Sequence, residues 1–390
     1  MKRTLLATSI AATLAVSSTP AFADSEVEEL RNTVERLMER IETLEAREER
    51  GERVASRTAG EGSGTVEPMN EGEKLSIYGG VHLSVDHNSG DFGDGSKGTG
   101  LKSNASRLGF KGAMPTLLDG TDLFYKAEVR YGAADEVDNE IEWREAYAGM
   151  RGGWGSLRAG RLGVHYKSTY TKIDPWTDNA PQARQSKGKQ GVSAFHSSYF
   201  NNAMEYVTPR FNGVHGAVWY STQFDGEDAD IHNAGGPLAN FRGGDAMGAG
   251  LRYGGEGLRI SADVIDIDAD DVLDDRLAND TGWQVSARYR TGPFTVAGLY
   301  EDVEDIGLGK NLFINGIYRI GPTRLIASYG RNRDAEYWND RDIDTWSLGA
   351  KYDLTDKSEL FAAYVTRDEG DDRYNTITVG VNAKFGASIW

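Results

Sequence analysis

Cysteine is absent from this chain of 390 residues, which excludes disulfide bonds and thiolate metal or redox sites. Proline is scarce, with 9 residues, whereas glycine is frequent, with 48. Beyond the first residues no apolar run reaches the roughly 18 residues that a membrane-spanning helix needs. Positive charge is also in the minority, because 43 Lys and Arg are outnumbered by 60 Asp and Glu, for a net charge of −17. Such acidity argues against nucleic acid as a partner.

The first residues predict export from the cytoplasm. Two basic residues precede an apolar run over 5–16, and a small-residue cleavage pattern ends at Ala23. We expect residues 1–23 to be a cleaved signal peptide, since the apolar run is too short to span a bilayer. The mature chain then begins at Asp24.

Residues 24–50 carry a heptad pattern, with apolar residues spaced three and four apart and flanked by Glu and Arg. This spacing predicts a short coiled coil, and a single solvated amphipathic helix is the alternative. Residues 51–74 lack periodicity and are rich in Gly, Glu and Ser, so we expect a flexible linker. The seam of the coiled coil consists of Val27, Leu30, Val34, Leu37, Ile41 and Leu44.

From Leu75 onward the apolar period becomes two, which is typical of β-strands. Tight turns alternate with long polar connections, as in outer-membrane barrels. A soluble sandwich is the alternative, but the many Arg and Lys opposite the apolar face favour a wide, water-filled lumen. The sequence therefore predicts an all-β fold, a 16-stranded antiparallel transmembrane β-barrel over 75–390, preceded by the short helical coiled-coil segment. The expected strands are 75–86, 104–113, 121–131, 140–151, 155–161, 203–209, 214–223, 246–254, 257–266, 281–290, 294–302, 310–320, 323–331, 342–352, 358–368 and 375–390.

The same alternation places a cluster of cations on the inner face of the early strands. Glu145 falls on the outer face and interrupts the pattern. We expect these cations to form a basic wall of the pore. The expected members of the wall are Arg107, Lys111, Lys126, Arg130, Arg144 and Arg158.

The longest break between expected strands, residues 162–203, contains the acids Asp174 and Asp178. A structureless insertion of this length is usually functional. Folded into the lumen, it would set carboxylates across a narrow aqueous gap from the basic wall, and the transverse field would favour small hydrated polar solutes. The equal alternative is an exposed loop whose charges are solvated.

Three stretches resemble the general, trimeric porins of Gram-negative outer membranes, and the terminal strand shares the likeness. The resemblance covers 75–390. The stretches are "SRLGFKG" (106–112), "WREAYAGMRGGWGSLRAGR" (143–161) and "NNAMEYVTPRFNGVHGAVWYS" (201–221).

The resemblance implies a homotrimer of sixteen-stranded barrels in the outer membrane, each with a long third loop that constricts the pore. Arg107 and Arg144 match arginines of the family's basic wall, and Asp174 and Asp178 resemble its acidic counterpart. The chain departs from the family in its N-terminal heptads and in ending with Trp390 where Phe is usual.

This resemblance predicts passive diffusion of ions and small hydrophilic solutes through a water-filled channel. The implied partners are outer-membrane lipids including lipopolysaccharide, the barrel assembly machinery and the solutes themselves. No catalytic fingerprint is found, no cofactor is expected, and the six histidines lack metal-ligand spacing. The alternatives are a substrate-selective channel for an anion or a sugar, and a barrel-anchored structural tether to the cell wall.

The terminal strand, expected to pair with the first near 75–85, carries the aromatic residues Phe385 and Trp390. They resemble the signal by which the assembly machinery recognises barrels, and an indole also suits the membrane interface. Strict alternation nevertheless sets Trp390 on the face opposite Phe385. Either a bulge at Gly386 shifts the phase, or the lipid-spanning part ends near Phe385.

Overall fold

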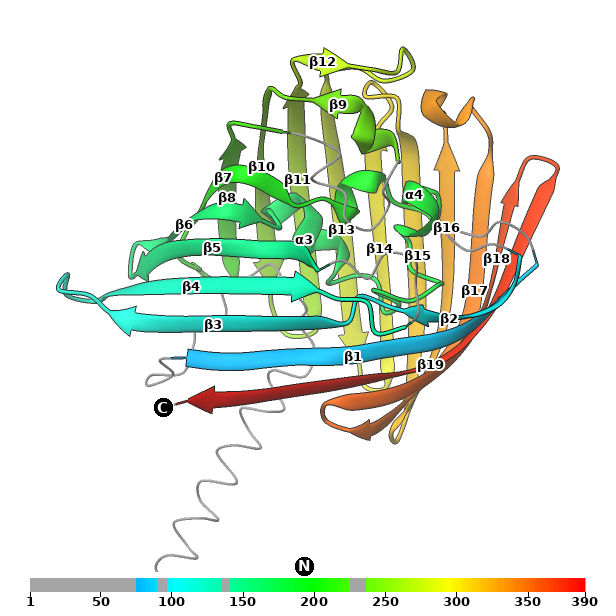
Figure 1. The fold of residues 1–390 in the computed structure, drawn as a ribbon, viewed down its shortest axis with the longest axis horizontal. Helices are drawn as coiled ribbons and strands as arrows, with labels where there is room; N and C mark the ends of the chain where they lie inside the picture. The colour runs from blue at the N-terminus through cyan, green and yellow to red at the C-terminus, as the bar shows by residue number, and fades with distance from the viewer. Residues whose placement is uncertain (1–74, 90–96, 135–140, 225–235, 390) are drawn as a thin grey trace, which may run out of the picture. The chain divides into compact units, whose positions relative to one another are not determined.

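The computed structural model describes residues 75–89, 97–134, 141–224 and 236–389 (Figure 1). The chain divides into two units, residues 1–60 and 61–390, and every described residue belongs to the second. The expected signal peptide, coiled coil and linker, together with Trp390, lie outside the described residues.

Antiparallel strands make up most of the described chain and pair in sequence order (Figure 1). Their regular alternation of outward apolar and inward polar residues suits a sheet that has one face on lipid and one on water. The strands are β1 Leu75–Asn88, β2 Gly98–Ser103, β3 Arg107–Pro115, β4 Thr121–Arg130, β5 Glu142–Gly152, β6 Gly155–Leu162, β7 Phe200–Val207, β8 Val214–Ser221, β10 Asp245–Gly254, β11 Leu258–Asp268, β13 Thr281–Thr291, β14 Phe294–Val303, β15 Gly309–Ile320, β16 Thr323–Arg333, β17 Ile343–Thr355, β18 Ser358–Glu369 and β19 Asp372–Ile389.

The sheet closes on itself, because β1 pairs with β19 over its whole length. β2 and β3 pair with successive stretches of β1, so they act as one strand interrupted at residues 104–106. Counted in this way, the described residues form a 16-stranded barrel, which confirms the predicted fold. The predicted strand began only at residue 104, so the prediction missed the stretch Gly98–Ser103. A closed barrel leaves no strand edge open.

Faces alternate as the sequence predicted. In β13, Trp283 and Val285 are exposed on the outer surface, whereas Gln284 and Ser286 are buried inside. Since lipid contacts only every second residue, the chain can span a bilayer while remaining polar in composition. Within the part of the chain that the structure describes, no helix combines the length and apolar character required to cross a membrane.

The terminal strand is regular to its described end. Its register with β1 runs from Thr376 to Ile389 without a shift, so the first of the two alternatives, a bulge at Gly386, is wrong. Phe385 lies opposite Gly79, and a Cβ added to Gly79 would come within 2.5 Å of the Phe385 ring. The glycine therefore leaves room for the aromatic side chain to lie flat on the neighbouring strand.

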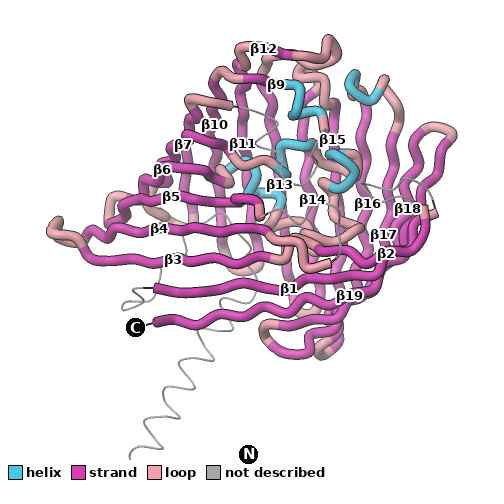
Figure 2. Tube along the Cα trace, in the orientation of Figure 1, coloured by secondary structure: helices cyan, strands magenta, loops and turns pink. Residues whose placement is uncertain are grey.

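Connections at one rim are tight turns, such as 153–154, 292–293 and 321–322, and most at the other rim are long. Two short strands of the long connections, β9 Phe241–Arg242 and β12 Asp271–Val272, form a separate ribbon. The longest connection, 163–199, lies between β6 and β7 and carries short helices, drawn in cyan in Figure 2. The helical segments of this connection are α3 His165–Tyr170, α4 Gln185–Gly188 and η1 Ala194–Ser197. Other connections carry η2 Pro237–Asn240 and η3 Glu336–Trp338.

Candidate functional site

Loop 163–199 folds into the barrel. Inward-facing amide side chains of β13, β15 and β16 donate hydrogen bonds to its backbone carbonyls, and nearly all of its residues are buried. A loop that lay over the rim could not reach Asn315, which lies in the middle of β15. The donors and acceptors are Gln284 with Tyr166 (2.8 Å), Asn315 with Ile173 (2.9 Å) and Asn332 with Gly188 (3.0 Å).

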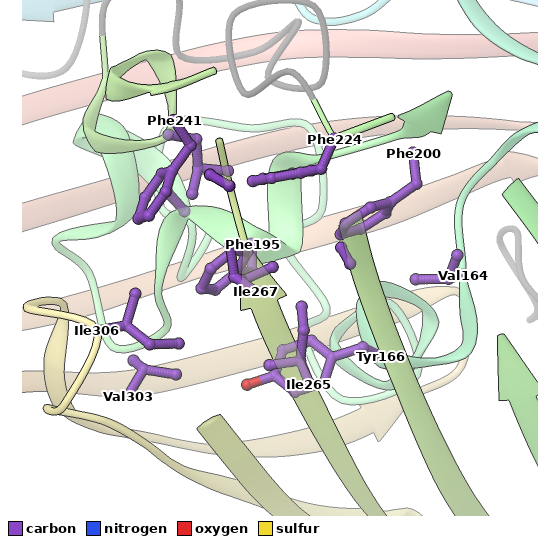
Figure 3. Close-up of a cluster of buried hydrophobic side chains, with 14 of the residues drawn as sticks. Val164, Tyr166, Phe195, Phe200, Phe224, Phe241, Ile265, Ile267, Val303 and Ile306 are labelled. Atoms are coloured by element: carbon purple, nitrogen blue, oxygen red, sulfur yellow. The ribbon is translucent and has the colours of Figure 1, made fainter. Parts of the chain in front are cut away.

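An apolar cluster holds the loop against one side of the lumen (Figure 3). Val164, Tyr166 and Phe195 of the loop belong to the same buried cluster as Ile265 and Ile267 of β11. Burying each large side chain contributes about 1.5–3 kcal/mol. Further members from β7, the end of β14 and the long connections cover the cluster, among them Phe200, Phe224, Phe241, Val303 and Ile306.

Glu301 of β14 is the principal polar anchor of the loop, and it is fully buried. Its carboxylate accepts hydrogen bonds from the Tyr166 hydroxyl (2.8 Å) and from His196 Nε2 (3.0 Å). The backbone N–H and hydroxyl of Ser193 (2.7 and 2.8 Å) and the Asn311 amide (3.1 Å) also donate to it. Five donors on one carboxylate offset the cost of burying the charge. They hold the loop at Tyr166 and again at Ser193 and His196.

The six predicted wall cations lie on β3 to β6 and face inward, but carboxylates share that surface. Arg144 donates to Glu128 (2.8 Å), and Arg158 donates to Glu205 of β7 (2.5 Å). We call the inward surface of β3 to β7 the β3–β7 wall. The other contacts in it are Lys126 with Glu145, Arg130 with Glu142 (3.6 Å), and Lys111 over the Tyr78 ring (5.8 Å).

The expectation that Glu145 faces outward is wrong. Opposite Glu128 and Val129 the register of β5 shifts by one residue, so that Glu145 and Trp143 are the successive partners and Arg144 is the extra residue. This β-bulge turns both Arg144 and Glu145 into the barrel, where both are buried. The bulge thus adds a carboxylate to a wall that the sequence had indicated as basic.

The two predicted loop acids have different surroundings. Asp178 contacts Arg107 of β3 directly and accepts a second ion pair from Arg184 of the loop (2.6 Å). Burial alone would raise the pKa of Asp178, but the two guanidinium groups hold that pKa well below its usual range. The predicted aqueous gap between loop acid and wall is therefore wrong for this pair, since the two side chains touch.

Asp174 does not face the wall. Its carboxylate accepts the backbone N–H groups of Trp176 and Ala183, both at 2.8 Å, within the loop itself. Burial raises the pKa of Asp174 above its usual range, although these two hydrogen bonds lower it in part. Asp174 therefore shapes the loop, and Asp178 ties it to the barrel.

Six charged residues described above were not among the predicted site residues: Glu128, Glu142, Glu145, Glu205, Glu301 and Arg184. The strand alternation could have identified Glu205, because it follows outward-facing Met204 in β7. No such signal marks Arg184, since it lies in a segment whose apolar residues have no regular spacing. Among the described residues, no group of three or more His, Asp or Glu side chains is placed to hold a metal ion.

We expect the Asp178 ion pairs to survive mild acid. Because the folded-state pKa lies below the unfolded value, the stability contribution is present above that unfolded pKa and is lost only as pH falls through the folded pKa. Asp178→Asn should cost about 3 kcal/mol of unfolding free energy, and this deficit should stay constant from about pH 7 to about pH 5. Urea unfolding in detergent measures it.

Asp174→Asn is the matched comparison. Because folding raises the pKa of Asp174, the wild-type protein becomes more stable as pH falls and this residue takes up a proton. The difference in unfolding free energy between wild type and Asp174→Asn should therefore grow towards acid. A deficit of Asp178→Asn that disappears by about pH 5 would contradict the assignment of a low pKa to Asp178.

Comparison with known proteins gives a consistent result. The family model described as "Gram-negative porin" matches residues 7–387. The major outer membrane protein P.IB of Neisseria meningitidis is 26% identical over 313 residues, covering 77% of this chain and 88% of that protein. A monosaccharide porin of Halomonas is 22% identical over 347 residues, covering 83% and 80% of the two chains. Among solved structures, an anion-selective porin from Comamonas acidovorans superposes with a TM-score of 0.60 at 17% identity, covering 80% of this chain and 99% of that one.

Proposed function

Because this chain belongs to the Gram-negative porin family and forms a diffusion channel in the outer membrane, we propose that loop 163–199 sets the width of that channel. Members of the family are non-enzymatic. The observation that carries the proposal is the ring of contacts between the loop and inward residues of β13, β15 and β16. With the loop held in this way, solutes would pass between the loop and the β3–β7 wall.

The charges beside this path favour small hydrophilic solutes of either sign. Arg144, Arg158 and Lys126 each contact a carboxylate of the same wall, and Arg107 contacts the loop acid. Paired charges produce a weaker field than an unbalanced basic wall, while their polarity still excludes apolar solutes. We therefore propose passive diffusion of ions and small polar molecules, with the predicted wall cations and Asp178 at the narrow part.

The segments that precede the barrel are proposed from sequence alone. Residues 1–23 would be the signal peptide, 24–50 a coiled coil and 51–74 a linker. Assembly into a homotrimer, contact with lipopolysaccharide and recognition of the C-terminal aromatic residues by the assembly machinery complete the proposal. Porin membership supports these partners as a class.

A substitution at Gly330 of β16 tests the role of the loop. A Cβ built on Gly330 would lie 1.9 Å from the Gln190 carbonyl oxygen, which is backbone of the loop. Gly330→Ala should therefore displace the loop and change single-channel conductance in planar bilayers, with the barrel intact by heat-modifiable gel migration.

Gly316→Ala is the matched control, because it makes the same change on neighbouring β15 where nothing lies within 4 Å of the new Cβ. We expect its conductance to equal that of wild type. If Gly330→Ala also conducts as wild type does, the loop does not set the width of the channel.

A further inference from the structure

A short stretch of loop 163–199, which we call the 186–191 segment, has a strained backbone. Ser186 and Lys187 have φ angles of 58° and 63°. Side chains with a Cβ rarely adopt this left-handed region, because the Cβ comes too close to the following carbonyl oxygen. The two residues interrupt α4, which is therefore not a regular helix. Since neither of them is a glycine, local preference does not account for this path of the chain.

Side chains of two barrel strands hold the segment in this conformation. Asn332 of β16 is 1% exposed, and its amide donates to the Gly188 carbonyl (3.0 Å) while its oxygen accepts the Gly191 N–H (2.9 Å). Arg367 of β18 donates to the Ser186 hydroxyl. Left-handed non-glycine residues persist only where surrounding contacts fix them. The two strands supply such contacts at both ends of the segment.

A third contact ties the segment to the long connection between β16 and β17. Lys189 Nζ donates to Glu369 of β18 (2.9 Å) and lies over the ring of Trp338 in η3, 4.2 Å from the ring centroid. A carboxylate and an indole face both attract the ammonium group. The segment is thus held from β16, β18 and η3, and its strained backbone depends on all three.

The barrel wall blocks movement of the segment in one direction. A Cβ built on Gly330 of β16 would lie 1.9 Å from the Gln190 carbonyl oxygen, and one built on Gly191 would lie 2.7 Å from the Gly330 Cα. The backbones of segment and strand are therefore in direct contact. While Glu301 still anchors the loop, a segment that loses its contacts can move only away from β16, towards the lumen.

We propose that the 186–191 segment is a strained switch that narrows the channel when it leaves β16, on the premise that loop 163–199 sets the channel width. Release costs the contacts from β16, β18 and η3, but the backbone then relaxes from its left-handed conformation. This relaxation offsets part of the loss and brings the two arrangements closer in free energy. The channel should therefore show two conductance levels, of which the lower corresponds to the released segment.

Substitutions at Lys187 isolate the backbone strain in single-channel recordings of the full chain in planar bilayers. Lys187→Gly and Lys187→Ala remove the same side chain and the same charge, but only glycine tolerates the left-handed backbone without strain. The fraction of time spent in the lower level should be about fivefold smaller in Lys187→Gly than in Lys187→Ala, a ratio that corresponds to about 1 kcal/mol.

Substitutions of two inward asparagines isolate the contacts that hold the segment. Asn332→Ala removes both hydrogen bonds to the segment, so the fraction of time in the lower level should rise by about tenfold. Asn315→Ala is the matched control on neighbouring β15, because it removes a hydrogen bond to the Ile173 carbonyl, outside the segment. Its fraction should stay within about twofold of wild type. The Lys187 pair leaves the barrel wall unchanged and decides the matter if Asn332→Ala does not fold.

The outcomes separate the switch from the role of the loop in channel width. A lower level that is rarer in Lys187→Gly than in Lys187→Ala, and more frequent in Asn332→Ala than in Asn315→Ala, supports the switch. Equal fractions in the two Lys187 variants, or a single level in folded Asn332→Ala, overturn it, while an altered conductance of Gly330→Ala would still support the loop as the determinant of width. Wild-type conductance of Gly330→Ala would overturn that premise and the switch with it.

Discussion

Glu301→Ala is expected to release loop 163–199 and to lower the unfolding free energy by about 3–5 kcal/mol, the cost of breaking a buried charged network. The substitution leaves the Tyr166 hydroxyl, His196 and Ser193 inside the barrel without their acceptor. Urea unfolding in detergent measures the loss, and single-channel recordings should show larger and noisier conductance because the loop is no longer tied to β14.

Two further variants give this prediction its controls. Glu301→Gln keeps one acceptor oxygen and the side-chain volume, so its loss should be smaller. Glu304→Ala removes an acid that follows the same strand and is 43% exposed beside Lys310, so stability should change by no more than about 1 kcal/mol. If Glu301→Ala and Glu304→Ala are equally stable, the buried network does not hold the loop.

Arg107→Glu combined with Arg144→Glu is expected to shift the channel strongly towards cations. Arg107 contacts Asp178 of the loop, and Arg144 is buried beside Glu128. Each reversal replaces an attraction by a repulsion between acids at close range, where the low local dielectric strengthens it. The reversal potential in a KCl gradient measures the shift, and the repulsion should also loosen the contact between loop and wall.

Arg276→Glu combined with Arg373→Glu is the matched control. Both residues lie in connections or at strand ends, both carry their own acidic partners, and the change in net charge is identical. This control should leave the reversal potential close to that of wild type. If the Arg107 and Arg144 reversals change neither selectivity nor conductance, these two residues do not line the pore.

Much of the barrel could be predicted because the relevant signal is local. A period of two in residues such as Trp283, Gln284 and Val285 reports which face of a strand is apolar, whatever the strand pairs with. Tight turns mark strand ends in the same way, and the closing pair β1 and β19 follows once the strand count is even. The missed stretch Gly98–Ser103 carries four glycines or small polar residues and no apolar alternation, so the local signal was absent there.

The candidate site could be predicted only as a set of residue types. Arg107 and Asp178 were expected to act together, and they do lie in contact, but the predicted gap between them is filled. No pattern in the sequence indicates that Asp174 turns back to its own loop. That distinction depends on two backbone N–H groups, whose directions follow from the path of a segment without period.

What the sequence alone determined was therefore the class of fold, the faces of its strands and the family, since each rests on patterns within about ten residues. Tertiary structure decided which charges meet: Arg158 with Glu205, Asp178 with Arg107, and Glu301 with the loop. The physical reason is that an electrostatic contact depends on distance in space, and these partners come from different strands and loops. A one-residue bulge at Arg144 was enough to move Glu145 from the lipid face into the lumen.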